Sequence, residues 1–398
     1  MIKSVTGTGR TSGYRLLAIA ALALTACGGD GGSDAAQDST APTEAVVATT
    51  EAPASTSAAA DASATTAPTG SSTAATFDQA VYDDALAELV SAAEEEGTLV
   101  VYSSQNTDPF NELVEAFRAA YPSIDVQSAR MVDTEMIPRL DTELSTGANG
   151  ADLAVTAALD WVQLQADQGN FVDASASPSI AGLGRYDADQ FVHEGNYFEV
   201  GAALATFAWN TELVPDGLTS YEDIVADPEL QRRVGVVDPA ISSAAVDFWL
   251  WLEETFGTDY IEQLAELEPR IYAGAQPMIE AISSGEISVG TFASTSVLAG
   301  SIEAGAPVEY ALDPAGVWGI RFYGAIPKSA QHPAAAALFA EFMLSPEGQE
   351  IVNVNAASVL PDIPGTLTTS ANARIWDVEA TSPDAVAEYN ARWNELFR

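Results

Sequence analysis

Lysine, histidine and cysteine are scarce in this chain of 398 residues. It contains two lysines (Lys3 and Lys328), two histidines and one cysteine, Cys27. Lysine and arginine together number 15 against 57 aspartates and glutamates, which gives a formal net charge of −42. Binding to nucleic acids or to anionic lipid headgroups needs basic side chains, so the composition argues against both. One cysteine excludes an intramolecular disulfide, and two histidines make a cysteine- or histidine-rich zinc site impossible.

The apolar run near the start, residues 16–24, is too short to cross a bilayer, because a spanning helix needs about 20 apolar residues. It follows Lys3, Arg10 and Arg15 and leads into small residues. A basic start, a short apolar run and small residues together predict a secretory signal. We expect residues 1–26 to be this signal, which places the rest of the chain outside the cytoplasm.

The sequence that ends at Cys27 reads LTAC and is similar to a bacterial lipobox, in which the cysteine is lipidated and becomes the mature N-terminus. We therefore expect a lipoprotein held at the outer face of the bacterial cell membrane by lipid on Cys27. The alternative is an ordinary cleaved signal next to a chance cysteine. Residues 28–76 have almost no large apolar side chains, so they cannot form a core. We interpret residues 27–76 as a disordered tether of Ala, Ser, Thr and Pro.

After residue 76, short apolar strands alternate with amphipathic helices. About 320 residues remain there, enough for two domains. One helix places apolar side chains at the i, i+3, i+4, i+7 spacing of a core face: Phe110, Leu113, Val114 and Phe117. The expected strands include residues 98–102, 124–129, 153–156 and 234–237. This alternation predicts an α/β fold, with parallel sheets covered by helices on both faces.

Two helix starts can be predicted from acidic residues that follow strands. We expect Asp108 to cap the helix after the first strand, with Pro109 at its first position. We expect Asp160 to cap the helix after the strand at 153–156.

Small and hydroxylated residues follow four of the expected strands. In open α/β sheets, ligands bind beyond the carboxyl ends of the strands. Helix N-termini at such positions have free N–H groups that favour anionic groups. Each residue alone could be an ordinary helix cap, but recurrence at four strand ends favours a binding cleft. The candidate ligand-binding residues are Ser103, Ser104, Gln105, Thr156, Ala157, Ser242, Ser243, Ser294 and Thr295.

Four sequence blocks carry a family resemblance: GTLVVYSSQN, WNTELVPDGLTSYEDIVADPELQRRVGVVDP, MIEAISSGEISVG and GAIPKSAQHPAAAALFAEFMLSPEGQEIV. In order and spacing they resemble the extracytoplasmic solute-binding proteins of ABC importers, in the set that includes ferric-iron, phosphonate and other small-solute binders. The resemblance implies a type II periplasmic-binding-protein fold: two α/β lobes, two crossing strands and a cleft between the lobes. It also implies that a permease and its ATPase are partners. We expect a monomer without a cofactor.

The same resemblance suggests how the chain is divided. We expect residues 77–205 and 318–371 to form the first lobe and residues 206–317 to form the second. Residues 372–398 are expected to form helices that pack on the second lobe. The crossings should lie near residues 202–211 and 316–326. A helix near residue 333 would pack Leu338, Phe339, Phe342 and Met343 inward.

The chain departs from the ferric-iron pattern of the family. Ferric members typically place adjacent tyrosines after the strand that matches EISVGTF, but here residues 293–296 read Ala-Ser-Thr-Ser and no two tyrosines are adjacent. Ferric iron prefers anionic oxygens, so a standard ferric site is not expected, and a non-standard one is the alternative. By analogy, Arg321 and Tyr323 on the second crossing join the candidate ligand-binding residues. We expect a small organic solute with an oxyanion, such as a phosphonate or phosphate ester.

Two other function classes are compatible with parts of the sequence. A histidine-dependent enzyme would have to use His193 or His332, for which surface or capping roles are the simpler interpretation. No carboxylate spacing points to hydrolysis, so we do not expect an enzyme. A ligand-sensing receptor subunit could use the same two-lobed module, and the sequence does not distinguish it from a transport protein.

Overall fold

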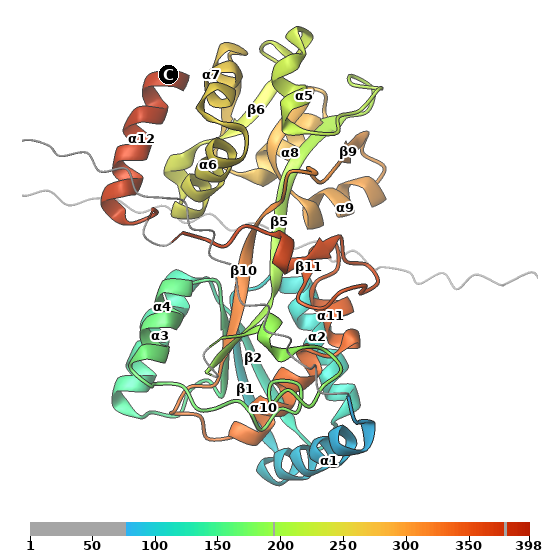
Figure 1. Ribbon diagram of the computed structural model, residues 1–398, viewed down its shortest axis with the longest axis vertical. Coiled ribbons are helices and arrows are strands. Elements are labelled where there is room, and N and C mark those ends of the chain that lie inside the picture. The colour runs from blue at the N-terminus through green and yellow to red at the C-terminus, as the bar shows by residue number, and fades with distance from the viewer. Residues whose placement is uncertain (1–76, 194–195, 378–379) are drawn as a thin grey trace, which may run out of the picture. The chain divides into compact units, whose positions relative to one another are not determined.

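The structure of the protein is a computed structural model (Figure 1), which describes residues 77–193, 196–377 and 380–398. The expected signal peptide, Cys27 and the tether lie outside these residues. The strands are β1 (Thr98–Ser103), β2 (Asp125–Arg130), β3 (Leu153–Thr156), β4 (Val192–His193), β5 (Tyr197–Asn210), β6 (Val234–Val237), β7 (Arg270–Tyr272), β8 (Val289–Ser294), β9 (Val308–Tyr310), β10 (Trp318–Ala325), β11 (Ala357–Ser358) and β12 (Thr368–Thr369). The α-helices are α1 (Gln79–Glu96), α2 (Thr107–Ala120), α3 (Asp133–Thr146), α4 (Leu159–Asp167), α5 (Tyr221–Ala226), α6 (Ser243–Phe256), α7 (Thr258–Glu266), α8 (Ala275–Ser283), α9 (Thr295–Glu303), α10 (Pro333–Met343), α11 (Pro346–Val352) and α12 (Pro383–Phe397).

Two groups of parallel strands are joined by two antiparallel strands. β1 pairs in parallel with β2 and β3, and β6 pairs in parallel with β7 and β8. Between the groups, β10 pairs antiparallel with β3 and β5, and β5 pairs antiparallel with β8. The path through the sheet is therefore β2-β1-β3-β10-β5-β8-β6-β7. The predicted α/β class and the two predicted crossings, which are β5 and β10, are confirmed.

Separate hydrophobic cores form on the two groups of strands. The first core includes Phe110 and Phe339, and the second includes Phe248 and Trp393. A smaller core around Trp161 covers the other face of the first group of strands with α3 and α4. We call the elements around the first and the smaller core the first lobe, and those around the second core the second lobe. Figure 1 shows α1, α2, α10 and α11 beside the first-lobe strands, and α5 to α9 with α12 around the second-lobe strands.

The predicted core faces of two first-lobe helices are confirmed. Phe117 of α2 packs edge-on against Phe339 of α10, with ring centroids 4.9 Å apart. Edge-to-face contacts of this kind add to the energy of burying the rings. The buried side chains are Phe110, Leu113, Val114 and Phe117 on α2, and Leu338, Phe339, Phe342 and Met343 on α10.

Both predicted helix caps are wrong. The N-cap of α2 is Asn106, so Asp108 and Pro109 lie inside its first turn. The N-cap of α4 is Ala158, and Asp160 is the second residue of that helix. Each helix therefore begins two residues earlier than the acidic residue suggests. An acidic side chain within the first turn still interacts favourably with the helix dipole, which is why Asp in this pattern marks a start without fixing the cap.

A third segment, residues 370–376, also connects the lobes, leading from β12 towards α12. Arg374 in this segment donates a hydrogen bond to Asp247 Oδ1 of α6 at 2.9 Å. After it, α12 packs on α6 through Trp393 and Trp249, with ring centroids 5.5 Å apart. The last helix is thus part of the second core, and three stretches of chain link the two lobes.

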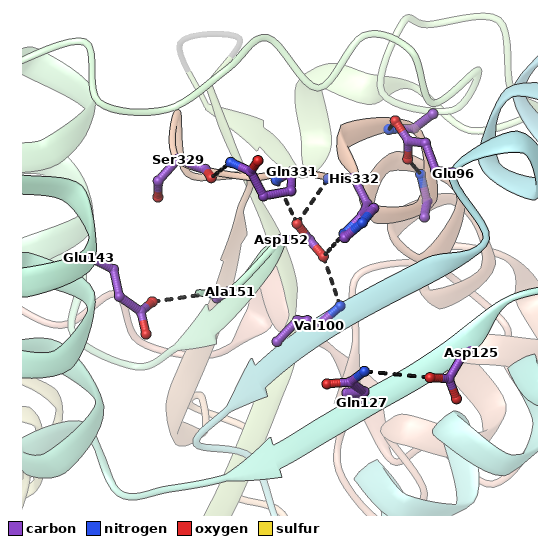
Figure 2. Close-up of polar contacts among 12 residues, drawn as sticks. Glu96, Val100, Asp125, Gln127, Glu143, Ala151, Asp152, Ser329, Gln331 and His332 are labelled. Carbon is purple, nitrogen blue, oxygen red and sulfur yellow. Dashed lines mark hydrogen bonds and ion pairs between the residues drawn. The ribbon is translucent and has the colours of Figure 1, made fainter. Parts of the chain in front are cut away.

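A buried carboxylate joins β1, β3 and the start of α10 (Figure 2). Asp152 accepts hydrogen bonds from the backbone N–H groups of Val100, Gln331 and His332 at 2.8–3.0 Å, and lies 2.9 Å from His332 Nδ1. The Glu96 carboxylate accepts from two N–H groups in the first turn of α10. His332 therefore lies at a helix start, as predicted, and its ring contacts Asp152. Glu96 accepts hydrogen bonds from the free N–H groups at the same N-terminal end of α10.

Candidate functional site

Four helices begin soon after strands of the two lobes. In the first lobe α2 follows β1 and α4 follows β3, and in the second lobe α6 follows β6 and α9 follows β8. The start of α4 and the start of α6 line one cavity, and the starts of α2 and α9 line another. Free N–H groups at helix starts can bind the anionic or hydroxyl groups of a ligand. The carboxyl ends of the strands therefore meet in two places between the lobes.

The first cavity, which we call the α4–α6 cavity, has a volume of about 470 Å³. Small-molecule sites usually measure about 300–1,000 Å³, so it can hold a small organic solute. Two lining residues come from the first lobe and the others from the second lobe or the segment before α12. They are Leu159, Asp160, Ser243, Trp376, Thr381, Ser382, Pro383 and Val386.

The two sides of the α4–α6 cavity present different polar groups. On the second-lobe side, Ser242 Oγ accepts from the N–H of Ala245 at 3.1 Å, and α6 has no acidic residue in its first turn. The indole of Trp376 is held in place because its Nε1 donates to Thr381 Oγ1 at 2.6 Å. On the first-lobe side, the exposed carboxylate of Asp160 is in the first turn of α4.

The second cavity, which we call the α2–α9 cavity, has a volume of about 420 Å³. Across it, Asn106 Nδ2 of the first lobe donates to Ser296 Oγ of the second at 3.4 Å, and Ser296 Oγ is 3.3 Å from Ser294 Oγ. Thr295 is buried and donates to the carbonyl of Asn355 at 2.6 Å. The lining residues are Asn106, Thr107, Asp108, Pro109, Ser294, Ser296, Val297, Val354 and Asn355.

The predicted ligand-binding residues fall into two groups. Ser243 and Ser294 line the two cavities, one each, and Ser242 caps α6 beside the first. The others lie at the strand ends but are buried or use their polar atoms within the protein: Thr156 Oγ1 donates to Asp133 Oδ1 at 2.7 Å. The buried residues are Ser103, Gln105, Thr156, Ala157 and Thr295. Ser104 is half-buried, and its Oγ has no hydrogen-bond partner among the described residues.

Arg321 and Tyr323, predicted on the second crossing, belong to a buried polar cluster on β5 and β10. Arg321 Nη1 lies 2.8 Å from Glu199 Oε2, and their side chains are only 9% and 2% exposed. Burial acts to raise the pKa of Glu199, but contacts with His193 and Arg321 outweigh it and lower the pKa below its ordinary value. Burial and the Glu199 charge raise the pKa of the Tyr323 phenol. The positive charge of Arg321 is therefore already neutralised inside the protein.

Among the described lining residues, each cavity offers one carboxylate, Asp160 in the first and Asp108 in the second, and neither offers the phenolates of a standard ferric site. No tyrosine is among the described residues that line them. Tyr102 lies in the first-lobe core, where burial and Glu143 raise its pKa to about 12, and its hydroxyl donates to Glu143 Oε1 at 3.0 Å. Within the described parts of the chain, no three His, Cys, Asp or Glu side chains gather to hold a metal ion.

The fold is shared with known solute-binding proteins. A model of the bacterial extracellular solute-binding protein family matches residues 99–355. The chain belongs to this family. Solute-binding proteins of ABC importers bind small solutes outside the cytoplasm and work with a permease and an ATPase; they are binding proteins of transporters, not enzymes. In the described residues, no helix is long and apolar enough to cross a membrane.

Solved structures share the fold of this solute-binding protein. The substrate-binding protein of an ABC transporter from Agrobacterium tumefaciens is 22% identical, with a TM-score of 0.60 and a match over 76% of this chain and 94% of that one. Iron-bound HitA from Pseudomonas aeruginosa is 19% identical, with a TM-score of 0.55 over 75% and 99%. The Trichodesmium protein IdiA (FutA), in complex with iron and citrate, is 19% identical, with a TM-score of 0.53 over 75% and 98%. A search of curated proteins finds no match.

Residues missed by the sequence analysis contribute much of the α4–α6 cavity. The sequence predicts Asp160 only as a helix cap, and it predicts no role for Trp376 and Ser382, yet all three line this cavity. The signal for Asp160 was present, since it follows a strand end as the other candidates do. No local pattern marks Trp376, because its position depends on the third connection between the lobes.

Proposed function

We propose that this solute-binding protein captures a small organic solute with an oxyanion in the α4–α6 cavity and delivers it to a permease. The observation that carries the proposal is a ligand-sized cavity with walls from both lobes. In a two-lobed protein, a solute that contacts both walls favours the closed arrangement of the lobes, because it binds that arrangement more tightly. The closed, loaded form would then be the one that the permease recognises.

We propose that the oxyanion binds at the start of α6. Its first turn carries no acidic residue, so no carboxylate within that turn offsets its N–H groups and positive dipole end. Ser243 lines the cavity at this point and can add a hydroxyl donor. Hydrogen bonds to a charged acceptor are stronger than neutral ones, which favours a phosphonate, phosphate ester or carboxylate over an uncharged polyol.

The α2–α9 cavity is proposed as a second contact region that closes with the first. Ser294 and Ser296 face Asn106 across the lobes there. A small movement of the lobes would change this weak contact, while Ser104 and the buried strand-end residues would support the walls. The uncharged residues 290–296, GTFASTS, would thus supply hydroxyl donors near the solute.

Lipid attachment at Cys27 is part of the proposal and rests on the LTAC sequence. Lipid with residues 27–76 as a tether would keep the binding domain at the membrane near its permease. Metabolic labelling with a radioactive fatty acid tests this, because label should enter the natural protein and not a Cys27→Ala variant.

The solute can be identified directly. Mass spectrometry of small molecules released from the purified full-length protein should find an oxyanion-bearing compound, and calorimetry with phosphonates, phosphate esters, carboxylates and sugars should rank binding in the same way. Preferred binding of uncharged sugars would contradict the proposed solute class.

Ferric iron is the second candidate, because two proteins of the same fold are described with bound iron. Such a site here would need donors other than tyrosines lining the two cavities. Addition of ferric citrate to the purified protein gives a clear answer. Tight uptake with a visible charge-transfer band would favour iron and remove the organic solute from the proposal.

A further inference from the structure

The two cavities between the lobes contain acidic but no basic side chains. Asp160 is exposed in the α4–α6 cavity and Asp108 in the α2–α9 cavity, and no Lys, Arg or His is among the described lining residues of either. The nearby cations on the connecting segments are already used: Arg321 pairs with Glu199, and Arg374 pairs with Asp247. The whole chain has a net charge of −42. A solute that is only an anion would meet unbalanced repulsion here.

The acidic groups are distributed unevenly between the two walls. The first-lobe helices α2, α3 and α4 each have an acidic residue in the first turn, whereas the second-lobe helices α6 and α9 have none. The start of α12, which also lines the α4–α6 cavity, carries Asp384 and begins with a proline that has no N–H. Within this cavity, α6 is therefore the helix start that suits an anion, and the opposite wall suits a positive group.

Trp376 adds an independent feature that suits a cation. Its indole is half-buried in the cavity wall and fixed by the bond to Thr381. The face of a tryptophan attracts organic cations such as ammonium groups, and Asp160 supplies a negative charge in the same cavity. An aromatic face together with a carboxylate recognises both the apolar surface and the charge of a substituted ammonium group.

We propose that the solute is a zwitterion, which places its oxyanion at the start of α6 and its ammonium group between Asp160 and Trp376. This inference rests on the proposed function, since it describes the solute of the same cavity. It adds the group that a plain phosphonate or phosphate ester lacks. Such a solute carries one positive charge more than its matched anion, so the acidic cavity repels it less.

Matched solutes can test the two charges separately. Calorimetry on the full-length protein would compare ethyl phosphate with phosphoethanolamine and phosphocholine, and propionate with β-alanine and glycine betaine. Ethanolamine and choline provide the cation alone. We expect at least one zwitterion to bind ten times or more as tightly as its matched anion. A matched anion that binds as tightly as its zwitterion would overturn the inference but leave the proposed function standing. If no solute with an oxyanion binds, both the zwitterion inference and the proposed function are overturned.

Variants then show whether Asp160 and Trp376 cause the preference for a zwitterion over its matched anion. Asp160→Asn should bind the preferred zwitterion at least tenfold more weakly and the matched anion no more weakly than before. Asp167→Asn is the control, because it removes the same charge from the exposed end of the same helix, outside the described cavity lining. Trp376→Phe should retain more affinity than Trp376→Leu. Unchanged zwitterion affinity in Asp160→Asn, with cooperative unfolding retained, would refute the assignment.

Discussion

At the scale of single residues, one buried ion pair, Glu199 with Arg321, supports a prediction about stability. Glu199 and Arg321 are both buried where the crossing strands β5 and β10 pair, and Arg321 also donates to the carbonyl of Ala373 at 2.5 Å. Taking two charges out of water is costly, and the contact between the two groups and the Arg321 bond to Ala373 offset this cost, although Glu199 Oε1 and Arg321 Nε have no hydrogen-bond partner among the described residues. Removing one partner should therefore cost more than removing both.

Glu199→Gln tests this at a defined pH. The folded-state pKa of Glu199 is lowered, so its ionised form stabilises the fold above the unfolded value of about 4.3. That contribution is lost as pH falls through the lower folded-state pKa. We expect the variant to lose about 3 kcal/mol at pH 7 and the difference from the natural protein to shrink below pH 4. Urea unfolding at pH 7, 5 and 3.5 measures it.

The double variant Glu199→Leu/Arg321→Met is the matched control for this prediction. Since it leaves no unpaired buried charge, it should be more stable at pH 7 than Arg321→Met or Glu199→Leu alone. His193, whose Nε2 is 3.9 Å from Glu199 Oε2, is kept in all variants. Strictly additive losses would show that the two charges do not depend on each other.

At the scale of elements, the sequence is most informative where a segment is buried on both sides. The observed bounds of β3 and β6 match the prediction, because a short apolar run between turn signals is typical of a parallel strand that is buried on both faces. Helix starts were less predictable: the N-caps of α2 and α4 both lie two residues before the Asp that was expected to cap them. Asp is favourable throughout a first turn, so its position does not determine the start.

Asp152 shows how one side chain can join three elements, and it supports a second stability prediction (Figure 2). Asp152→Asn should leave the N–H groups of Val100, Gln331 and His332 with a poorer acceptor, because an amide has one oxygen where the carboxylate has two. We expect a loss of about 3 kcal/mol in the free energy of unfolding, measured by urea denaturation. Asp125→Asn is the control: it lies exposed on β2, where a surface substitution should change stability by less than about 0.5 kcal/mol.

At the scale of the whole molecule, connections between distant parts of the chain determine the site, and this is what the sequence could not supply. Trp376 reaches the α4–α6 cavity because residues 370–376 cross between the lobes and are held there by Arg321 and Arg374. No local pattern near Trp376 encodes partners more than 50 positions away. Strand ends were different, because the α/β fold brings them together in every member of the class, and the sequence alone predicts that Ser243 and Ser294 lie near such a cavity.

Net charge is the second property of the whole molecule, and it leads to a prediction about salt. With 57 acidic and 15 basic residues, self-repulsion should destabilise the compact state. Raising NaCl from 10 mM to 1 M shortens the screening length from about 30 Å to about 3 Å. At pH 7 we expect the midpoint of thermal unfolding to rise by at least about 3 °C, which corresponds to roughly 2 kcal/mol for about 320 folded residues. The control is the same protein near its sequence pI of 4.1, where the net charge is close to zero and salt should have little effect. An equal rise at both pH values would mean that salt acts through something other than screening of the acidic surface.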